Sequence, residues 1–281
     1  MGVFLDDSGV KLRSGWILAI FTVLAAGTYA FCSAALALAG LHLQSPLSLD
    51  DVSLFFTTMV MLIAASVPTL ICAFGLKAEV GLPRARAARD CLLGLALGSA
   101  LVTLAVAIPT LAGQGPLTLY DGTARALAIA AATQLLILAP TSVGEELLLR
   151  GVVMRELARG TRPWLAVLLT GAVFGVMHLV NPGASPIAAL NVGLVGLWFG
   201  VLAIRTSLWT SIGAHVAWNL FEGFVLGQPV SGINPGPSLF AGTVHPSGFF
   251  SGGDFGPEAS GLTTVLLALA TAASMAWPKK P

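Results

Sequence analysis

Three short patterns in the chain contain the side chains that could do chemistry. Within each pattern, residues four positions apart share one face of a helix. The patterns are Glu145 and Glu146 with Arg150, Phe174 with His178, and His215 with Asn219. All three occur in apolar stretches, where ionisable groups are costly and usually face the interior of a helical bundle. These residue types therefore mark a candidate catalytic site inside a membrane.

The two adjacent glutamates have different expected roles. Glu146 precedes Arg150 by one helical turn, in the favourable order for an ion pair, so we expect Arg150 to keep Glu146 ionised. Glu145 points about 100° away around the helix and has no local cation. This makes Glu145 the candidate general base. The alternative is that both glutamates only mark the charged end of a membrane helix.

Two related reaction schemes fit these groups. In the first, Glu145 with His178 polarises a water molecule for attack on a peptide carbonyl, and His215 with Asn219 stabilises the oxyanion. In the second, His178, His215 and Glu145 hold a divalent metal such as zinc, which acidifies its bound water. The chain lacks a His-Glu-x-x-His helix, the usual zinc-protease signature. The sequence alone leaves both schemes open.

Composition indicates a membrane protein. Apolar residues make up 56% of the chain and charged residues only 10%, whereas soluble domains carry about 25% charged residues. The net charge of +1, without a basic stripe, argues against a nucleic-acid partner. Three cysteines fall singly in separate apolar segments, which fits neither a zinc site nor a disulfide framework. They are Cys32, Cys72 and Cys91.

We therefore expect an all-α polytopic protein, with residues 1–281 forming a single membrane domain. Apolar stretches of about 17–25 residues suit membrane spans, and the chain has about eight of them. They lie near 15–41, 54–76, 91–113, 126–150, 163–181, 186–204, 208–226 and 260–277. Small-residue pairs four apart suit close helix packing in lipid. Examples are Gly94 with Gly98, Gly171 with Gly175, and Gly196 with Gly200.

The basic residues predict the orientation in the membrane. Every second connection between the expected spans is basic, and among the 14 lysines and arginines only Arg125 falls in another connection. Positive residues favour the cytoplasmic side. We therefore expect an integral protein of the bacterial plasma membrane with both termini in the cytoplasm.

The depths of the polar residues in the membrane can be compared for two helices that form an antiparallel hairpin. Glu145 and His178 lie at nearly equal sequence distances from the turn at 159–162, so they should come to the same level. His215 lies shortly after Arg205, and we place the site in the cytoplasmic half of the bundle. This requires the short outer connection at 182–185 to dip into the bundle.

For the remaining polar segments and residues, the sequence predicts a location but no chemical role. The long connection 227–257 is rich in glycine and proline and should lie outside. Loops of that length are usually functional or disordered. Glu222 fits an outer cavity or interface, and His42 and His245 are expected in solvated outer connections. The roles of Glu222 and of the loop, and the oligomeric state, are not indicated.

The three patterns, in this order and on membrane helices, resemble the motifs of the type II CAAX prenyl endopeptidase and bacteriocin-processing family, the CPBP intramembrane metalloproteases. The resemblance covers the expected catalytic core, residues 125–226, which is spans four to seven. The stretch Gly252-Gly-Asp-Phe-Gly-Pro-Glu258 also looks like a segment that precedes the last span in some bacterial members.

The resemblance implies a CAAX-type intramembrane peptidase with a membrane-associated peptide or protein substrate. Carried over by position, Glu145 is the catalytic base and His178 its partner on the water. His215 and Asn219 serve the oxyanion, and Glu146 with Arg150 holds the site together. The resemblance does not determine whether the substrate is prenylated, nor whether a metal takes part.

Three other functions compete with the peptidase hypothesis. Buried glutamates and histidines also form proton relays in transporters, although inverted repeats and broken helices are not evident. A non-catalytic immunity protein or scaffold is the second alternative. The third is a serine peptidase using Ser185 with His215, which leaves both glutamates and His178 unexplained.

Overall fold

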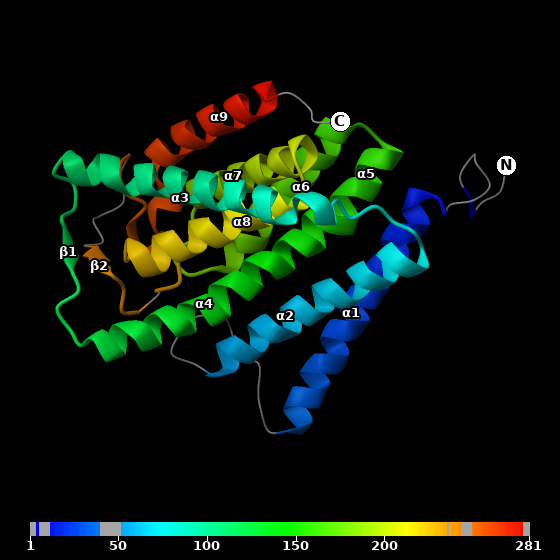
Figure 1. Ribbon diagram of the computed structural model, residues 1–281, viewed down its shortest axis with the longest axis horizontal. Helices are drawn as coiled ribbons and strands as arrows, with labels where there is room; N and C mark the ends of the chain where they lie inside the picture. The colour runs from blue at the N-terminus through cyan, green and yellow to red at the C-terminus, as the bar shows by residue number, and fades with distance from the viewer. Residues whose placement is uncertain (1–3, 6–11, 40–51, 235, 243–248, 278–281) are drawn as a thin grey trace.

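The computed structural model shows a bundle of long helices (Figure 1). It describes residues 4–5, 12–39, 52–234, 236–242 and 249–277, and the predictions for His42 and His245 fall outside these ranges. The major helices are α1 (Ser14–Leu38), α2 (Val52–Leu70), α3 (Ala87–Leu111), α4 (Ala124–Glu146), α5 (Met154–Gly160), α6 (Pro163–Met177), α7 (Pro186–Arg205), α8 (Leu208–Leu220) and α9 (Gly261–Ala276).

Short helical turns extend or connect these helices. Three are π-helical: η1 (Ile71–Gly75) after α2, η3 (Leu147–Val153) between α4 and α5, and η5 (Phe221–Val225) after α8. The others are 3₁₀ turns: η2 (Arg84–Arg86), η4 (His178–Val180), η6 (Gly253–Phe255) and η7 (Pro257–Ala259). π turns inside helices occur frequently at functional sites, and η3 follows Glu146 directly.

The polytopic all-α prediction is confirmed. Within the described ranges, each of the eight predicted spans corresponds to one helical rod, with α4, η3 and α5 forming one of them. Six of these rods are long and apolar enough to cross a membrane. The other two differ: α9 has only 16 residues, and α8 continues through its π turn η5 but is less apolar. The rod containing α8 carries His215, Asn219 and Glu222, which lower its apolar character.

Close helix packing depends on the predicted small residues. A methyl group added to Gly94 or Gly98 of α3 would collide with the backbone of α8 at Thr210 or Ala214. Small residues let membrane helices approach until their backbones touch. This approach holds α8, and with it His215, at a defined distance from α3.

The basic connections lie together at one end of the bundle. Arg159, at the end of α5, donates to the carbonyl oxygen of Leu12 at 2.6 Å. Arg205, at the end of α7, donates to the carbonyl oxygen of Trp277 at 3.1 Å. The start of α1 and the end of α9 are therefore near the same end, as an even number of spans requires.

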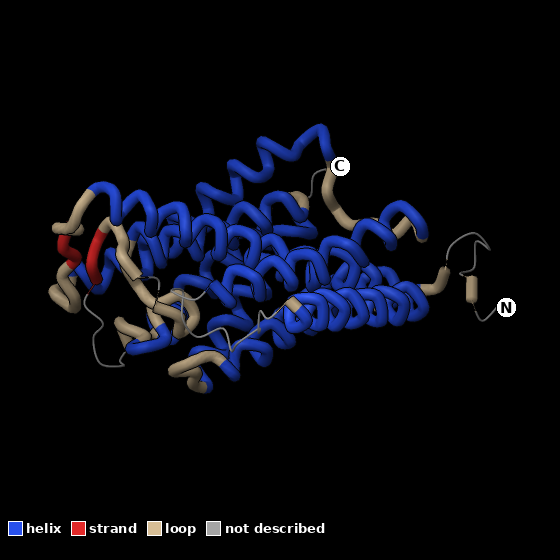
Figure 2. The backbone as a smooth tube through the Cα atoms, turned by 90° about the horizontal axis from the view of Figure 1, so that it is seen from below, coloured by secondary structure: helices blue, strands red, loops and turns tan. Residues whose placement is uncertain are grey.

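The opposite end contains a small antiparallel sheet and the long connection after η5. Strand β1 (Leu117–Leu119) pairs with β2 (Phe240–Gly242), Leu117 lying opposite Gly242. Figure 2 shows both strands and the loops around them at the end away from the start of α1. The sheet ties the α3–α4 connection to the long connection.

The short connection between η4 and α7 is covered by the long connection. The amide of Asn181 donates to the carbonyl oxygen of Ser231 at 2.9 Å, and Ala184 packs against buried Phe255. The connection is thus half-buried against the long connection, with Gly183 exposed.

The contact between α3 and α8 generates a stability prediction. Gly98→Val should lower the free energy of unfolding by about 1–3 kcal/mol, because overpacking forces the helices apart. Thermal unfolding of the purified protein in detergent would measure this. Gly27→Val is the matched control, since an added methyl at Gly27 meets nothing within 4 Å. Equal shifts in the two variants would contradict the packing argument.

Candidate active site

A fully buried carboxylate, Glu146, organises the site. Its Oε1 accepts from Arg150 at 2.9 Å and lies 3.1 Å from His215 Nδ1. Its Oε2 accepts from the hydroxyl of Ser211 at 2.5 Å. Because the side chains of Glu146 and Arg150 both have 0% exposure, each needs the other to offset the cost of burying a charge.

Arg150 extends this arrangement to the neighbouring helices. A second guanidinium nitrogen donates to the carbonyl oxygen of Gly196 in α7 at 2.9 Å. The guanidinium carbon lies 4.6 Å from the centre of the Phe174 ring, in cation–π range. A side chain at Gly196 would collide with Arg150 and Phe174. Arg150 therefore connects η3, α6 and α7 behind the site.

His215 joins the two glutamates. Its Nε2 lies 3.6 Å from Oε2 of Glu145, while its Nδ1 faces Glu146. The Phe199 ring stacks on the imidazole with a centroid distance of 4.8 Å. A carboxylate can only accept a hydrogen bond, so Nδ1 of His215 carries a proton. The orientation of the His215 ring is thus determined by Glu146 of α4 at one edge and by Phe199 of α7 on one face.

His178 begins the 3₁₀ turn η4 at the end of α6. Its Nδ1 lies 2.8 Å from the carbonyl oxygen of Phe174, an acceptor, so the proton is on Nδ1 and Nε2 has a free lone pair. The Phe174 ring makes edge contacts with both His178 and His215, at centroid distances of 4.6 and 5.7 Å. Phe174 therefore packs against both imidazoles.

One large cavity, of about 500 Å³, lies beside these groups. Four of the predicted site residues line it: Glu145, His178, His215 and Asn219. Glu146 and Arg150 lie behind the cavity wall. The amide nitrogen of Asn219 donates to the hydroxyl of Ser142 at 3.1 Å. All six predicted residues are thus brought together, four facing the cavity and two supporting them.

Several contributors to the site were not anticipated from the sequence. Ser211 lies one helical turn before His215, and that spacing could have indicated it. Ser142 lies one helical turn before Glu145 and Glu146, which could likewise have indicated it, and Glu258 ends the stretch Gly252–Glu258 that resembles a family segment. Phe199 and Ser231 have no local pattern that links them to the motifs. Ser185 caps α7, where its hydroxyl accepts from the amide of Ala188 at 3.2 Å. It is not among the cavity-lining residues, so the serine-peptidase alternative gains no support.

The donor side chains do not form a metal site. In the part of the chain that the structure describes, no three His, Cys, Asp or Glu side chains are grouped to hold a metal ion. The predicted set of His178, His215 and Glu145 therefore does not fit a metal, and no chemical step is assigned to one.

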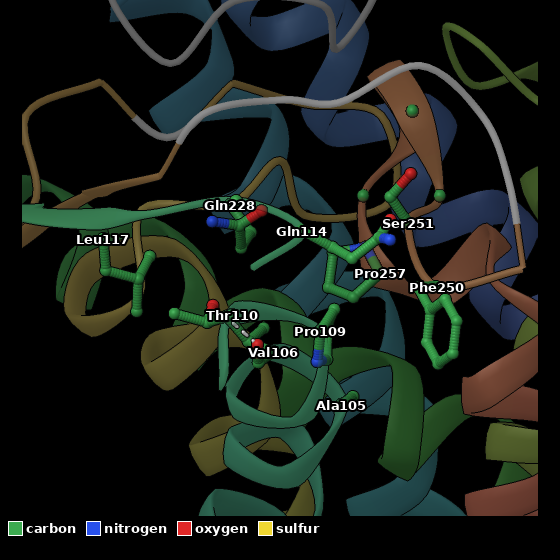
Figure 3. Close-up of a pocket in the computed structure, with 14 residues that line it drawn as sticks. Ala105, Val106, Pro109, Thr110, Gln114, Leu117, Gln228, Phe250, Ser251 and Pro257 are labelled. Atoms are coloured by element: carbon green, nitrogen blue, oxygen red, sulfur yellow. Dashed lines mark hydrogen bonds between the residues drawn. The ribbon is translucent and has the colours of Figure 1, made fainter. Parts of the chain in front are cut away.

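A second, much smaller hollow lies at the end of the bundle that carries the small sheet, between the end of α3 and the segment before α9 (Figure 3). Its volume is about 40 Å³, enough for about one water molecule. No ionisable side chain is among its lining residues. It therefore offers no site for acid–base chemistry.

Comparison with known proteins agrees with the motif resemblance. Residues 126–221 match the family described as type II CAAX prenyl endopeptidase Rce1-like, and this segment contains all six predicted residues. A stretch of 115 residues is 36% identical to the uncharacterized protein YyaK of Bacillus subtilis. The match covers 38% of this chain, and the chain spans 38% of that relative's length.

The Glu146–Arg150 pair generates a second stability prediction. Arg150→Met should reduce stability by about 3–5 kcal/mol, because it leaves a buried carboxylate without its cation. Adding Glu146→Gln to that variant should restore part of the loss, since the buried charge is then removed. Melting temperatures of the two single variants and the double variant would form a double-mutant cycle. Additive losses would contradict the coupling.

Proposed function

Because residues 126–221 match the Rce1-like family of type II CAAX prenyl endopeptidases, we propose that the protein is an intramembrane endopeptidase that uses water activated by Glu145. The observation that carries the proposal is the division between the two adjacent glutamates. Glu146 is occupied by Arg150, Ser211 and His215. Glu145 faces the cavity, and the only ion-pair partner found for it in the described chain is His215.

The reaction begins with water held between Glu145 and His178. Glu145 accepts a proton as the water oxygen bonds to the scissile carbonyl carbon. The carbonyl electrons move to its oxygen, forming a tetrahedral oxyanion. When that species collapses, the carbon–nitrogen bond breaks and Glu145 returns the proton to the leaving nitrogen. Glu145 thus acts first as base and then as acid, and the products are a carboxylic acid and an amine, which pass a proton between them to become a carboxylate and an ammonium.

His178 and Asn219 have free groups suited to this sequence. The Nε2 lone pair of His178 can accept a hydrogen bond from the attacking water. Asn219 uses one amide hydrogen on Ser142, which leaves the other for the oxyanion. A preorganised donor of this kind contributes about 3–4 kcal/mol to transition-state stabilisation.

His215 can assist the oxyanion only in a particular protonation state. Its Nδ1 already donates to Glu146, so a second donation from Nε2 requires the imidazolium form. The carboxylates of Glu146 and Glu145, on either side, stabilise that positive charge. The buried Glu146 therefore prepares His215 electrostatically as well as sterically.

The cavity supports a membrane-held apolar peptide as the substrate. It is lined mainly by aliphatic and aromatic side chains from α2, α4, α6, α7 and α8. Whether that substrate carries a prenyl group is part of the proposal that remains to be tested. The basic residues at one end of the bundle support an orientation with both termini on the cytoplasmic side.

Replacement of the proposed base is the central activity test. Glu145→Gln should reduce cleavage of a farnesylated or apolar peptide by at least about a hundredfold, because the amide cannot accept the proton. His178→Ala should cause a comparable loss by releasing the water. Product formation by the purified protein in detergent would be followed by mass spectrometry. Full activity of Glu145→Gln would exclude the mechanism, and absence of cleavage by the wild type would remove the enzymatic proposal.

Chelation separates the two schemes left open by the sequence. We expect wild-type turnover to change by less than about twofold after treatment with a strong zinc chelator and gel filtration, because the donors do not fit a metal site. The measurement is the cleavage rate before treatment, after treatment, and after zinc is added back. Loss of turnover with recovery on zinc addition would contradict the metal-free scheme.

A further inference from the structure

The segment Gly252–Glu258, which follows the small sheet and precedes α9, closes the outer side of the catalytic cavity. Phe255 is 1% exposed and packs with Phe174 and other residues of α6 and α7. The amide of Gly232 donates to the carbonyl oxygen of Phe255 at 2.8 Å, and Asn191 donates to that of Glu258 at 2.7 Å. The segment is therefore part of the cavity wall.

The carboxylate of Glu258 lies in this wall, and only one of its two oxygens accepts hydrogen bonds from the wall. Its Oε2 accepts from the amide and the hydroxyl of Ser231 at 2.7 and 2.6 Å. Its Oε1 makes no hydrogen bond within the described ranges. The residue is only 3% exposed and lines the cavity together with Glu145, His178 and His215. A carboxylate that faces a largely apolar cavity is costly to ionise, and a cation in the cavity would relieve that cost.

The cavity contains no cation that could neutralise Glu258. Neither lysine nor arginine is among its described lining residues, and Arg150 is engaged behind the wall by Glu146. The two histidines are close enough to interact electrostatically with Glu258, but Nδ1 of His178 lies against the carbonyl oxygen of Phe174, and His215 already lies between Glu145 and Glu146. Glu145 and Glu258 therefore make the cavity anionic.

Glu222 lies behind Glu258 and has a different environment. It is 0% exposed, and neither of its carboxyl oxygens has a hydrogen-bond partner in the described chain. Two neighbouring buried carboxyl groups resist ionising together. Ser231 supplies two close donors to Glu258, whereas the indole N–H of Trp218, which lies near Glu222, does not reach hydrogen-bonding geometry. The proton therefore belongs on Glu222. Burial raises the pKa of Glu258, and the Ser231 hydrogen bonds oppose that rise.

We propose that Glu258 forms an acidic subsite of the catalytic cavity, which selects substrates with an ammonium or guanidinium group near the scissile bond. The same carboxylate disfavours a substrate carboxylate at that place. This subsite rests on the proposed peptidase function and refines its substrate class. The cation could be a side chain or a free amino terminus.

The test is a lysine scan with the purified full-length protein in detergent. A neutral apolar peptide with blocked ends is prepared with lysine, norleucine or glutamate at each position in turn, and one further peptide has a free amino terminus. At one or two positions, the wild type should cleave the lysine peptide about ten- to a hundredfold faster than the norleucine peptide, as a charged hydrogen bond allows. Enhancement by the free amino terminus alone would identify that group as the source of the cation.

Two variants separate the subsite from a merely structural role. Glu258→Gln should bring the lysine-to-norleucine ratio to within about twofold of one, because the charge is lost while the shape is kept. Glu222→Gln is the matched control and should retain the wild-type ratio, since that group is already neutral. A structural defect would slow all peptides equally and leave the ratio unchanged.

The outcomes distinguish this inference from the peptidase proposal. No cleavage of any peptide by the wild type would overturn the function itself. Cleavage without a lysine preference, or a preference that survives Glu258→Gln, would overturn only the subsite. If Glu258→Gln does not fold, wild-type inhibition by octylamine and octanoate provides a second measurement. The amine should inhibit at about tenfold lower concentration, and equal inhibition would count against the subsite.

Discussion

A buried negative charge on Glu146 is the constraint around which the rest of the site is arranged. Its two oxygens face donors from η3 and α8, and without them the charge could not remain inside the bundle. Meeting that requirement brings together elements that are far apart in the chain. The positions of Arg150 and His215 follow from it, and Arg150 in turn places Phe174 against both histidines.

This constraint also explains how two adjacent glutamates can do different work. The helix turns Glu146 toward α8 and Glu145 toward the cavity. Glu146 is saturated with donors, while Glu145 keeps one side free for a water molecule. The two glutamates are consecutive in the sequence but have different functions, because neighbouring residues on a helix face different surroundings.

The long connection after α8 shows how irregular backbone can belong to a membrane-embedded site. Hydrogen bonds from Asn181, Asn191 and Ser231 satisfy its polar groups, which is the condition for non-helical chain at membrane depth. The connection that sequence reasoning placed simply outside thus supplies a wall of the cavity. Glu222, expected at an outer cavity or interface, is fully buried behind that wall.

The sequence by itself determined the membrane environment, the helical rods, the close-packing glycines and the six residues that gather at the site. These features depend on composition and on helical spacing, which local patterns record directly. Only the tertiary structure decided that Ser211 and His215 both meet Glu146, that Phe199 stacks on His215, and that Glu258 enters the cavity. A helical pattern reports which residues share a face, but it does not say which helix or loop that face will meet. The pairing of faces is settled by packing and by the need to satisfy buried charge across the whole bundle.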